Sequence, residues 1–222
     1  MKNSYNLRLK NLRYICLICV ICVPFFKWNL LVVNYIQQNW IEILGATLSF
    51  VYLYFSIKQK IALWIFGILC SALYLVVFFQ AKFYAEVTLQ LYYLAVSVYG
   101  WINWRLGHNE QTGKELPVKR ITRKQIILLS AATLIITGIY YYVLVHFTDS
   151  PVPFGDSFTV ALAIIATWLL TQKILENWLV FIVADALCAA LFLYKGLYPT
   201  AVLYVVYTIM AVVGYFRWKK TM

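Results

Sequence analysis

Charged residues are scarce in this sequence. Of its 222 residues, only 12% are Asp, Glu, Lys or Arg, whereas 64% are hydrophobic and the mean hydropathy is +0.77. A water-soluble domain is about one quarter charged and about half apolar. A soluble fold of this length needs more polar side chains than these to cover its surface. The composition therefore excludes a soluble protein and predicts one that crosses a membrane several times.

The sequence also lacks the residue patterns of enzymes and metal proteins. It contains no phosphate-binding loop, and its two histidines, His108 and His146, are separated by a predicted membrane-spanning segment. All five cysteines lie in apolar runs, and Cys16, Cys19 and Cys22 recur at every third residue without a His or a carboxylate beside them. We therefore expect no catalytic residue, no metal site and no cofactor, and we predict that the protein is not an enzyme.

Acidic residues are rarer than basic ones, with 8 against 19 and a net charge of +11. Such an excess of positive charge is also found in proteins that bind nucleic acids. Here, however, the Lys and Arg residues lie at the ends of apolar runs, as topology signals do in membrane proteins. We therefore expect a lipid bilayer, and no nucleic acid, as a partner.

Long apolar runs determine the expected fold class. They are continuous and roughly 20 residues long, without strict alternation, so they predict transmembrane helices and not the strands of a barrel. The first run, 14–36, is interrupted by Pro24 and Lys27 and predicts either an extra span or an interfacial helix. Seven clearer segments follow: 41–57, 62–80, 84–104, 125–146, 154–172, 177–195 and 198–216.

One stretch of the chain occurs twice. Residues 58–105 align with residues 172–219 at a constant offset of 114, without a gap. Rare residue types coincide in this register: Trp64 with Trp178, Phe78 with Phe192, Tyr84 with Tyr198, Gly100 with Gly214, and Trp104 with Trp218. Any two aromatic-rich membrane segments share some residues by composition. Repeated coincidence in one register instead favours an internal duplication, which is typical of transporters built from two similar halves.

The repeat and the charges together predict the topology. If the 105–124 link lies in the cytoplasm, most other basic residues of the core also lie inside, as the positive-inside rule requires. These residues are Lys58, Lys60, Lys173, Arg217, Lys219 and Lys220, whereas Lys82 and Lys195 lie outside. Two three-helix units that are fused directly would be inverted, so equal orientation requires one linking helix, which is 125–146.

We therefore predict an all-α membrane protein with a seven-helix 3+1+3 core of two parallel three-helix repeats, plus an extra N-terminal helix. The core begins outside and its C-terminus is cytoplasmic. The predicted parts are a basic segment with the extra helix (1–40), a first bundle (41–104), a cytoplasmic loop with the linking helix (105–147) and a second bundle with a basic C-terminus (148–222). Parallel repeats of this kind place a substrate site between them near the middle of the membrane.

A carboxylate inside a predicted span is the strongest candidate for a functional residue. Asp185 lies near the middle of segment 177–195, where insertion of its charge into lipid costs at least ~3 kcal/mol. Its side chain must therefore face a wet cavity, pair with a cation or carry a proton. The functional hypotheses are a counter-ion for a cationic substrate or a proton site, and the alternative is a structural Asp bonded to nearby hydroxyl groups.

Other polar and aromatic residues in the spans extend the candidate site. Gln90 shares a helix face with Tyr93 and suits either an amide or hydroxyl ligand or a bond between packed helices. The other candidates are aromatic or polar residues of the spans, of which Trp178 could instead be an interfacial anchor and Trp101 and Trp104 an aromatic belt. For substrate binding these are Trp64, Asn177, Trp178, Tyr204 and Tyr207, and for a gate they are Trp101 and Trp104.

Two groups of motifs are similar to those of a known family. The first runs from Phe78-Phe79-Gln80 through Leu89-Gln90 to Tyr99-Gly100-Trp101-Ile102-Asn103-Trp104, and the second contains Asp156-Ser157 and Glu176-Asn177-Trp178-Leu179. They resemble the PnuC family of vitamin transporters over about residues 40–217. The resemblance implies a fold related to SWEET sugar transporters, often trimeric. It also implies that Gln90, Trp101, Trp104, Asn177 and Trp178 line the substrate path or its gates.

The function that this resemblance implies is facilitated diffusion of an unphosphorylated vitamin precursor across a bacterial inner membrane. The substrate would be nicotinamide riboside first, and a cytoplasmic kinase or pyrophosphokinase would trap it inside. Asp185 departs from the neutral Asn that the resemblance leads us to expect. Both nicotinamide riboside and thiamine are aromatic cations, so a thiamine transporter of the same family remains an alternative, as does an ion-coupled symporter that uses Asp185.

Overall fold

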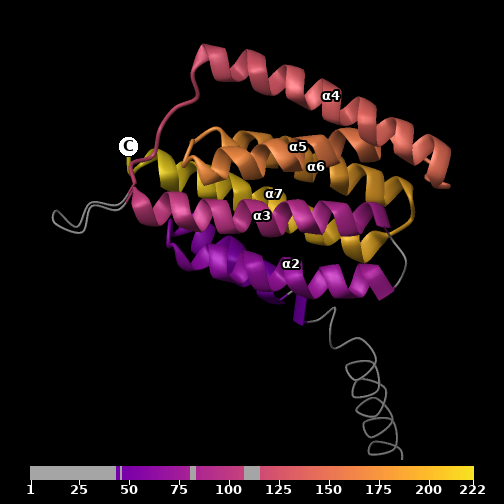
Figure 1. Cartoon of the computed structure of the whole chain (residues 1–222), viewed down its shortest axis with the longest axis horizontal. Helices are drawn as coiled ribbons and strands as arrows, with labels where there is room; N and C mark the ends of the chain where they lie inside the picture. The colour runs from indigo at the N-terminus through magenta and orange to yellow at the C-terminus, as the bar shows by residue number, and fades with distance from the viewer. Residues whose placement is uncertain (1–43, 46, 81–83, 108–115) are drawn as a thin grey trace, which may run out of the picture. The chain divides into compact units, whose positions relative to one another are not determined.

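The computed structural model describes residues 44–45, 47–80, 84–107 and 116–222 (Figure 1). Everything below concerns the compact unit Leu48–Met222, whose first helix begins one residue earlier, at Thr47. The segment 14–36, the three N-terminal cysteines and Lys82 lie outside the described residues. The extra N-terminal helix therefore stays a prediction.

The described chain consists of helices joined by short turns. A short apolar helix, Thr47–Ile57, comes first. It is followed by α2 (Ala62–Gln80), α3 (Tyr84–Leu106), α4 (Arg123–Phe147), α5 (Pro153–Thr171), α6 (Asn177–Tyr194) and α7 (Tyr198–Lys219). The six later segments that the sequence predicts agree with α2 to α7 to within three residues at either end. Lysines and polar turn residues lie at both ends of the apolar runs, so the ends of the helices could be predicted from the sequence.

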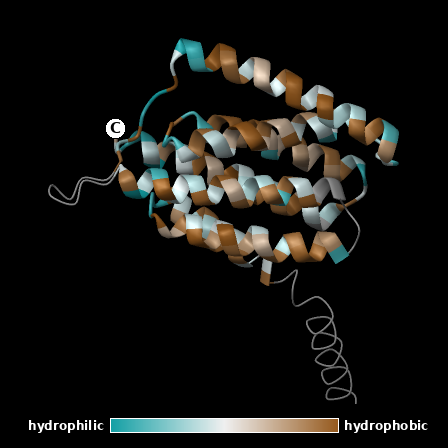
Figure 2. Cartoon of the chain, viewed as in Figure 1, coloured by the Kyte–Doolittle hydropathy of each residue, from teal (hydrophilic) through white to brown (hydrophobic). Residues whose placement is uncertain are grey.

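Hydrophobic residues occupy much of the length of these helices (Figure 2). Five segments are long and apolar enough to cross a membrane: α2, α4, α5, α6 and residues Thr200–Lys219 of α7. Many of their large apolar residues are exposed, among them Leu128 and Leu134 of α4 at 69% and 72%. Such exposure is costly in water and favourable in lipid. The fold is therefore that of an all-α membrane protein.

The sequence repeat is present as repeated packing. Gly100 of α3 lies so close to Trp64 of α2 that an added Cβ would stand 2.5 Å from the indole ring. At the equivalent place in the second half, a Cβ on Gly214 would stand 2.6 Å from the ring of Trp178. Glycine is required at both positions because each lets a buried tryptophan rest directly against a helix backbone. The two halves thus share the same contact between a glycine and a buried tryptophan, and not only a similar amino-acid composition.

The turn between the first two helices is also the same in both halves. Gln59 and Lys173, which are 114 residues apart, are the two non-glycine residues with positive φ in the described chain, at 56° and 55°. The backbone bond from Lys60 N to Phe55 O is matched by the bond from Ile174 N to Leu169 O. A left-handed residue closes both helices in the same way.

Both turns lie at one end of the unit. Trp218 at the end of α7 donates a hydrogen bond to the Ser56 carbonyl of the first turn, at 3.0 Å. Trp104 at the end of α3 donates to the Thr171 carbonyl of the second turn, at 3.1 Å. The two triplets therefore run in the same direction, as the sequence predicts. We call this the basic end, because it carries the following residues: Lys58, Lys60, Lys173, Arg217, Lys219 and Lys220.

The linking helix belongs structurally to the second triplet. Among the helices, α4 packs against α5, and α5 packs in turn against α6 and α3. The strand-like segment before α4 pairs with the second turn, because Lys119 N donates to Lys173 O and Leu175 N donates to Lys119 O. Glu176 accepts a further bond from Ile121 N at 2.9 Å. We therefore define bundle 1 as the 47–57 helix, α2 and α3, and bundle 2 as α4 to α7.

Candidate binding cavity

A cavity of about 530 Å³ lies between the two bundles. A volume of this size suits a ligand as large as a nucleoside, since small-molecule pockets span roughly 300–1,000 Å³. Its wall includes repeat-related positions from both halves: Tyr93 with Tyr207, and Ser56 with Leu170. Residues of both bundles therefore line the cavity, as expected for a substrate site between parallel repeats.

Helix α6 forms much of the cavity wall, whereas α2, its counterpart in the repeat, forms none of it. Residues from Trp178 of α6 to Lys195, which directly follows the helix, line the cavity over roughly 25 Å at 1.5 Å per residue. Its counterpart, α2, contributes no residue to the lining. The position in α2 that corresponds to Asp185 is Ser71, which is buried away from the cavity. The chemistry of the site is therefore asymmetric and is set by α6.

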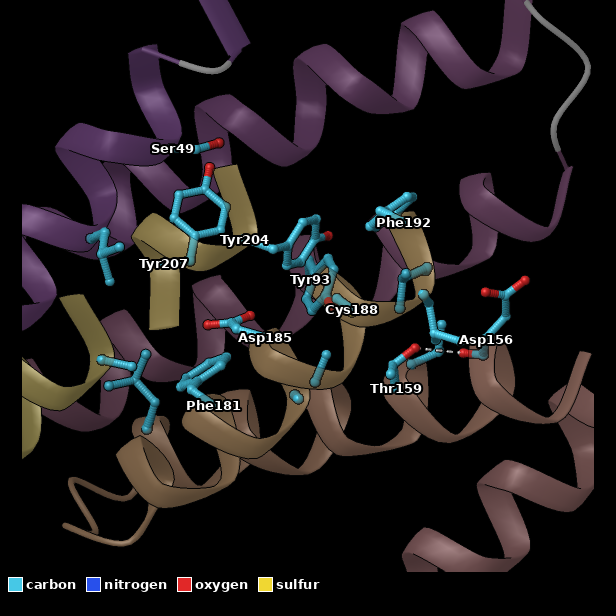
Figure 3. A pocket seen from close by; sticks show the side chains of 18 of the residues that line it. Ser49, Tyr93, Asp156, Thr159, Phe181, Asp185, Cys188, Phe192, Tyr204 and Tyr207 are labelled. Atoms are coloured by element: carbon cyan, nitrogen blue, oxygen red, sulfur yellow. Dashed lines mark hydrogen bonds between the residues drawn. The ribbon is translucent and has the colours of Figure 1, made fainter. Parts of the chain in front are cut away.

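Asp185 is the acidic group in the central part of the cavity. Figure 3 shows its side chain extending from α6 beside Phe181, with the ring of Tyr207 from α7 close by. Among the described residues, Asp185 forms no ion pair and accepts no hydrogen bond. A half-buried carboxylate without a protein partner is energetically unfavourable in an apolar wall. It is therefore available to a cation that enters the cavity.

Tyrosine and phenylalanine rings surround this carboxylate. Tyr204 packs against Tyr207 at 5.7 Å and against Phe192 at 5.2 Å between ring centroids. Tyr93 approaches from α3, and the Tyr207 hydroxyl points toward Ser49 (Figure 3). The faces of aromatic rings attract cations, and their flat surfaces stack on planar heterocycles. A carboxylate among tyrosines is thus suited to a flat, positively charged ligand.

At the basic end the cavity is closed by a cluster of buried tryptophans. Trp64 and Trp104 pack edge to face at 5.5 Å, and the repeat-related pair Trp178 and Trp218 does so at 5.6 Å. Trp104 and Trp218 also contact each other across the bundles, at 6.1 Å. None of the four indoles is more than 4% exposed. All four rings belong to one buried hydrophobic cluster.

An ion pair lies on the cavity wall at the opposite end. The Lys195 ammonium approaches both carboxylate oxygens of Asp156, at 2.6 and 2.8 Å. Ser150 donates a further hydrogen bond to Asp156 at 2.6 Å. Both charged side chains retain contact with solvent, at 18% and 25% exposure. Because the two charges neutralise each other, this pair adds polar groups but little net charge to the cavity wall.

Comparison with known proteins now assigns the family. The family model described as nicotinamide mononucleotide transporter matches residues 39–220, which is most of the chain. The chain belongs to this family. Membrane transport, and not catalysis, is the activity of a transporter family, so the prediction that the protein is not an enzyme is confirmed.

Relatives within the nicotinamide mononucleotide transporter family share the name PnuC, as the sequence motifs indicated. The nicotinamide riboside transporter PnuC of Neisseria mucosa is 30% identical over 82% of this chain and 73% of its own length. The Escherichia coli transporter of the same name is 24% identical over 81% of this chain and 85% of its own length. A crystal structure of the vitamin B3 transporter PnuC superposes with a TM-score of 0.67 at 28% identity, covering 90% of this chain and 88% of that one.

The structure brings together five of the eight predicted substrate-binding residues on the cavity wall. These are Tyr93, Trp178, Asp185, Tyr204 and Tyr207. Trp64, Gln90 and Asn177 do not line the cavity in this conformation. Trp64 packs against Gly100 behind the wall, and the Asn177 amide donates to Ile174 O at the start of α6. Their role in binding stays a prediction.

The two predicted gate residues lie at the basic end, but in different surroundings. Trp104 is buried within the tryptophan cluster and bonds to the other bundle. Trp101 is half-buried, and the Arg105 guanidinium stacks over its ring at 5.4 Å. Of the two, Trp104 therefore has the contacts expected of a closed gate.

Several cavity residues escaped the sequence analysis. Tyr52, Phe181 and Cys188 line the wall, and each was indistinguishable in sequence from ordinary apolar or packing residues. Asp156 and Lys195 are 39 positions apart, so their pairing had no local signature. The repeat offered one usable signal, since it pairs Tyr207 with Tyr93 and thus marks both as symmetric.

Proposed function

We propose that this protein carries nicotinamide riboside across a bacterial inner membrane by facilitated diffusion. The observation that carries the proposal is the Asp185 carboxylate, which lies without a protein partner among the tyrosines of a cavity between two parallel bundles. The nicotinamide ring of the riboside is flat and positively charged. Stacking on Tyr or Trp and a cation–π attraction of ~1–2 kcal/mol would add to the charge pairing.

The charge of the site also favours the riboside over its phosphorylated form. A phosphate monoester carries roughly −1.5 to −2 charges at neutral pH. Asp185 would repel this group, and the Lys195 ammonium, which could attract it, is held by both oxygens of Asp156. An unphosphorylated substrate that is phosphorylated in the cytoplasm would be trapped there, so net uptake requires no coupled ion.

Orientation follows from the positive-inside rule. We place the basic end in the cytoplasm, because it gathers the Lys and Arg residues at the ends of the spans. The cavity then reaches the outside at the Asp156–Lys195 end and is closed toward the cytoplasm by the tryptophan cluster. A homotrimer and the likeness to SWEET transporters remain part of the proposal, on the strength of the family resemblance alone.

A flux assay tests the proposal. Purified protein in liposomes should take up labelled nicotinamide riboside saturably, until the inside and outside concentrations are equal. Thiamine should compete because it is also a flat cation, whereas neutral riboflavin should compete weakly or not at all. If thiamine is taken up and the riboside is not, the chain is a thiamine transporter. Accumulation above the outside concentration under an imposed proton or sodium gradient would contradict simple facilitated diffusion.

Two substitutions compare a residue on the cavity wall with a residue outside it. Trp178→Ala should lower the affinity for nicotinamide riboside by about 10-fold or more, because it removes a fully buried ring from the wall. Gln90→Ala should lower it by a smaller factor, since Gln90 lies off the wall. Isothermal titration calorimetry of both variants measures the two affinities and shows which substitution lowers the affinity more. Unchanged affinity in both would place the binding site elsewhere.

A further inference from the structure

Hydrogen bonds between the bundles are concentrated at the basic end. Trp104 Nε1 and Asn103 Nδ2 of bundle 1 both donate to the Thr171 carbonyl of bundle 2, at 3.1 and 2.8 Å. Trp218 Nε1 of bundle 2 donates to the Ser56 carbonyl of bundle 1, at 3.0 Å. The tryptophan near the end of α3 thus bonds to the end of α5, and the tryptophan near the end of α7 bonds to the end of the 47–57 helix. The exchange is reciprocal and follows the sequence repeat.

Further contacts join the bundles at the same end. Gln59 Nε2 donates to Thr221 Oγ1 at 2.8 Å, and Gln172 Nε2 donates to the Tyr99 hydroxyl at 2.9 Å. Near the middle of the helices, Tyr92 donates to the Ile164 carbonyl at 2.8 Å. The side chains of Tyr207 and Ser49 also bond across the bundles, further from the basic end. The bonds of Asp156 with Lys195 and Ser150, at the opposite end, lie within bundle 2. Most of the hydrogen bonds named here between the bundles therefore lie at the basic end.

The two tryptophan bonds are also buried, which makes them suited to a switch. Ser56, Thr171 and Trp218 are at most 1% exposed, and Trp104 is 4% exposed. A buried donor that loses its acceptor bears the full cost of desolvation unless water or another acceptor replaces it. Separation of the bundles at this end must therefore break both bonds and bring water or another acceptor to the freed groups. A closed state with such bonds is discrete and not gradually adjustable.

We propose that the reciprocal bonds Trp104–Thr171 and Trp218–Ser56 form a two-part latch that holds the basic end of the transport path closed. This inference rests on the proposed transport function and names the residues that gate it. It adds Trp218, Ser56 and Thr171 to the gate that the sequence indicated at Trp104. The two parts are unequal, because Asn103 also holds the Thr171 carbonyl, whereas Trp218 is the side chain that holds Ser56.

Accessibility from the basic end tests the latch without any substrate. The reporter is Ser56→Cys, which is close to serine in size and lies on the cavity wall, in protein whose native cysteines are replaced by alanine. Sealed vesicles of either orientation are treated with a membrane-impermeant methanethiosulfonate. We expect Trp218→Phe to raise the labelling rate from the basic-end side by about 3- to 10-fold, the effect of one lost hydrogen bond. Trp104→Phe should raise it less.

Trp64→Phe is the matched control for this assay. It makes the same chemical change in the same tryptophan cluster, but Trp64 Nε1 has no acceptor among the described residues, so no bond between the bundles is lost. Its labelling rate should equal that of the parent. Equal rates for Trp218→Phe and Trp64→Phe would overturn the proposal, because the effect would then come from lost ring volume alone.

Cross-linking provides a second measurement that does not disturb the tryptophans. Gln59→Cys and Thr221→Cys place two thiols across the bundles at the basic end. Joining them with a short reversible bifunctional methanethiosulfonate should abolish flux but leave binding of nicotinamide riboside from the opposite side, and dithiothreitol should restore flux. Unchanged flux after cross-linking contradicts the latch. If no variant moves the riboside at all, the transport function fails, while the labelling assay still reports on the latch.

Discussion

Replacement of Asp185 by asparagine is expected to weaken the binding of nicotinamide riboside by about 10- to 100-fold, because hydrogen bonds and contacts with a charged partner are worth ~1.5–3 kcal/mol. Asparagine keeps the size of the side chain and most of its capacity for hydrogen bonding, but it removes the negative charge. Asp185 has no ion-pair partner among the described residues, so its loss leaves no protein cation uncompensated. Stability should therefore change little, and the affinity should change strongly.

The ligand itself supplies the control for this experiment. The reduced, dihydropyridine form of nicotinamide riboside has nearly the same shape but carries no positive charge. Both forms are titrated into the parent protein and into Asp185→Asn. The four affinities form a double-mutant cycle in which the positive charge of the ligand and the negative charge of Asp185 are each removed separately. We expect the substitution to lower the affinity for the cation and to leave that for the neutral form within about a factor of three. An equal loss for both forms would show that Asp185 does not act through its charge.

The same cycle separates a counter-ion from a proton-coupling residue. If Asp185 coupled transport to a proton gradient, Asp185→Asn would abolish gradient-driven accumulation while equilibrium exchange of labelled substrate continued. If it serves as the counter-ion, both net uptake and exchange should fall in proportion to the lost affinity. The measurement is counterflow in liposomes with and without an imposed pH difference. This comparison decides between the two functional roles that the sequence leaves open for a carboxylate in mid-membrane.

The sequence predicted the helices and their common direction more accurately than it predicted the wall of the cavity. Apolar runs bounded by lysines determine where α2 and α6 begin and end, because lipid tolerates few alternatives to a helix. The repeat then determined the direction of the triplets, since Trp64 and Trp178 occupy equivalent places beside Gly100 and Gly214. Both signals are local or periodic in the sequence, so they can be recognised without knowledge of the three-dimensional structure.

The site was only partly predictable, because it depends on how two similar bundles differ. Gln90 and Tyr204 occupy equivalent positions in the repeat, yet only Tyr204 lines the cavity. The sequence around neither residue indicates whether its helix faces the other bundle. The latch was not predictable either, because its acceptors are the backbone carbonyls of Ser56 and Thr171, and every residue has such a carbonyl. Sequence patterns record side chains, whereas these contacts join a side chain to a backbone.

Substitution of the two glycines that contact the buried tryptophans is expected to lower the stability of the protein strongly. Gly214→Ala would place a Cβ 2.6 Å from the ring of Trp178, and Gly100→Ala would place one 2.5 Å from the ring of Trp64. The atoms that are met belong to rigid, buried rings, so neither can move aside cheaply. Such overpacking costs ~1–3 kcal/mol, which exceeds the gain of up to about 1 kcal/mol from replacing glycine by alanine in a helix. Both variants should therefore unfold at lower temperature in detergent.

Binding should distinguish the two variants although their stabilities fall alike. Trp178 is part of the cavity wall and Trp64 is not, so Gly214→Ala should displace a ring from the site and lower the riboside affinity by about 10-fold. Gly100→Ala should leave the affinity within a factor of two or three. Gly138→Ala serves as the control, because no atom lies within 4 Å of its added Cβ, and it should be neutral or slightly stabilising. Equal losses of affinity in Gly100→Ala and Gly214→Ala would mean that both halves form the site equally, against the asymmetry that α6 and α2 display.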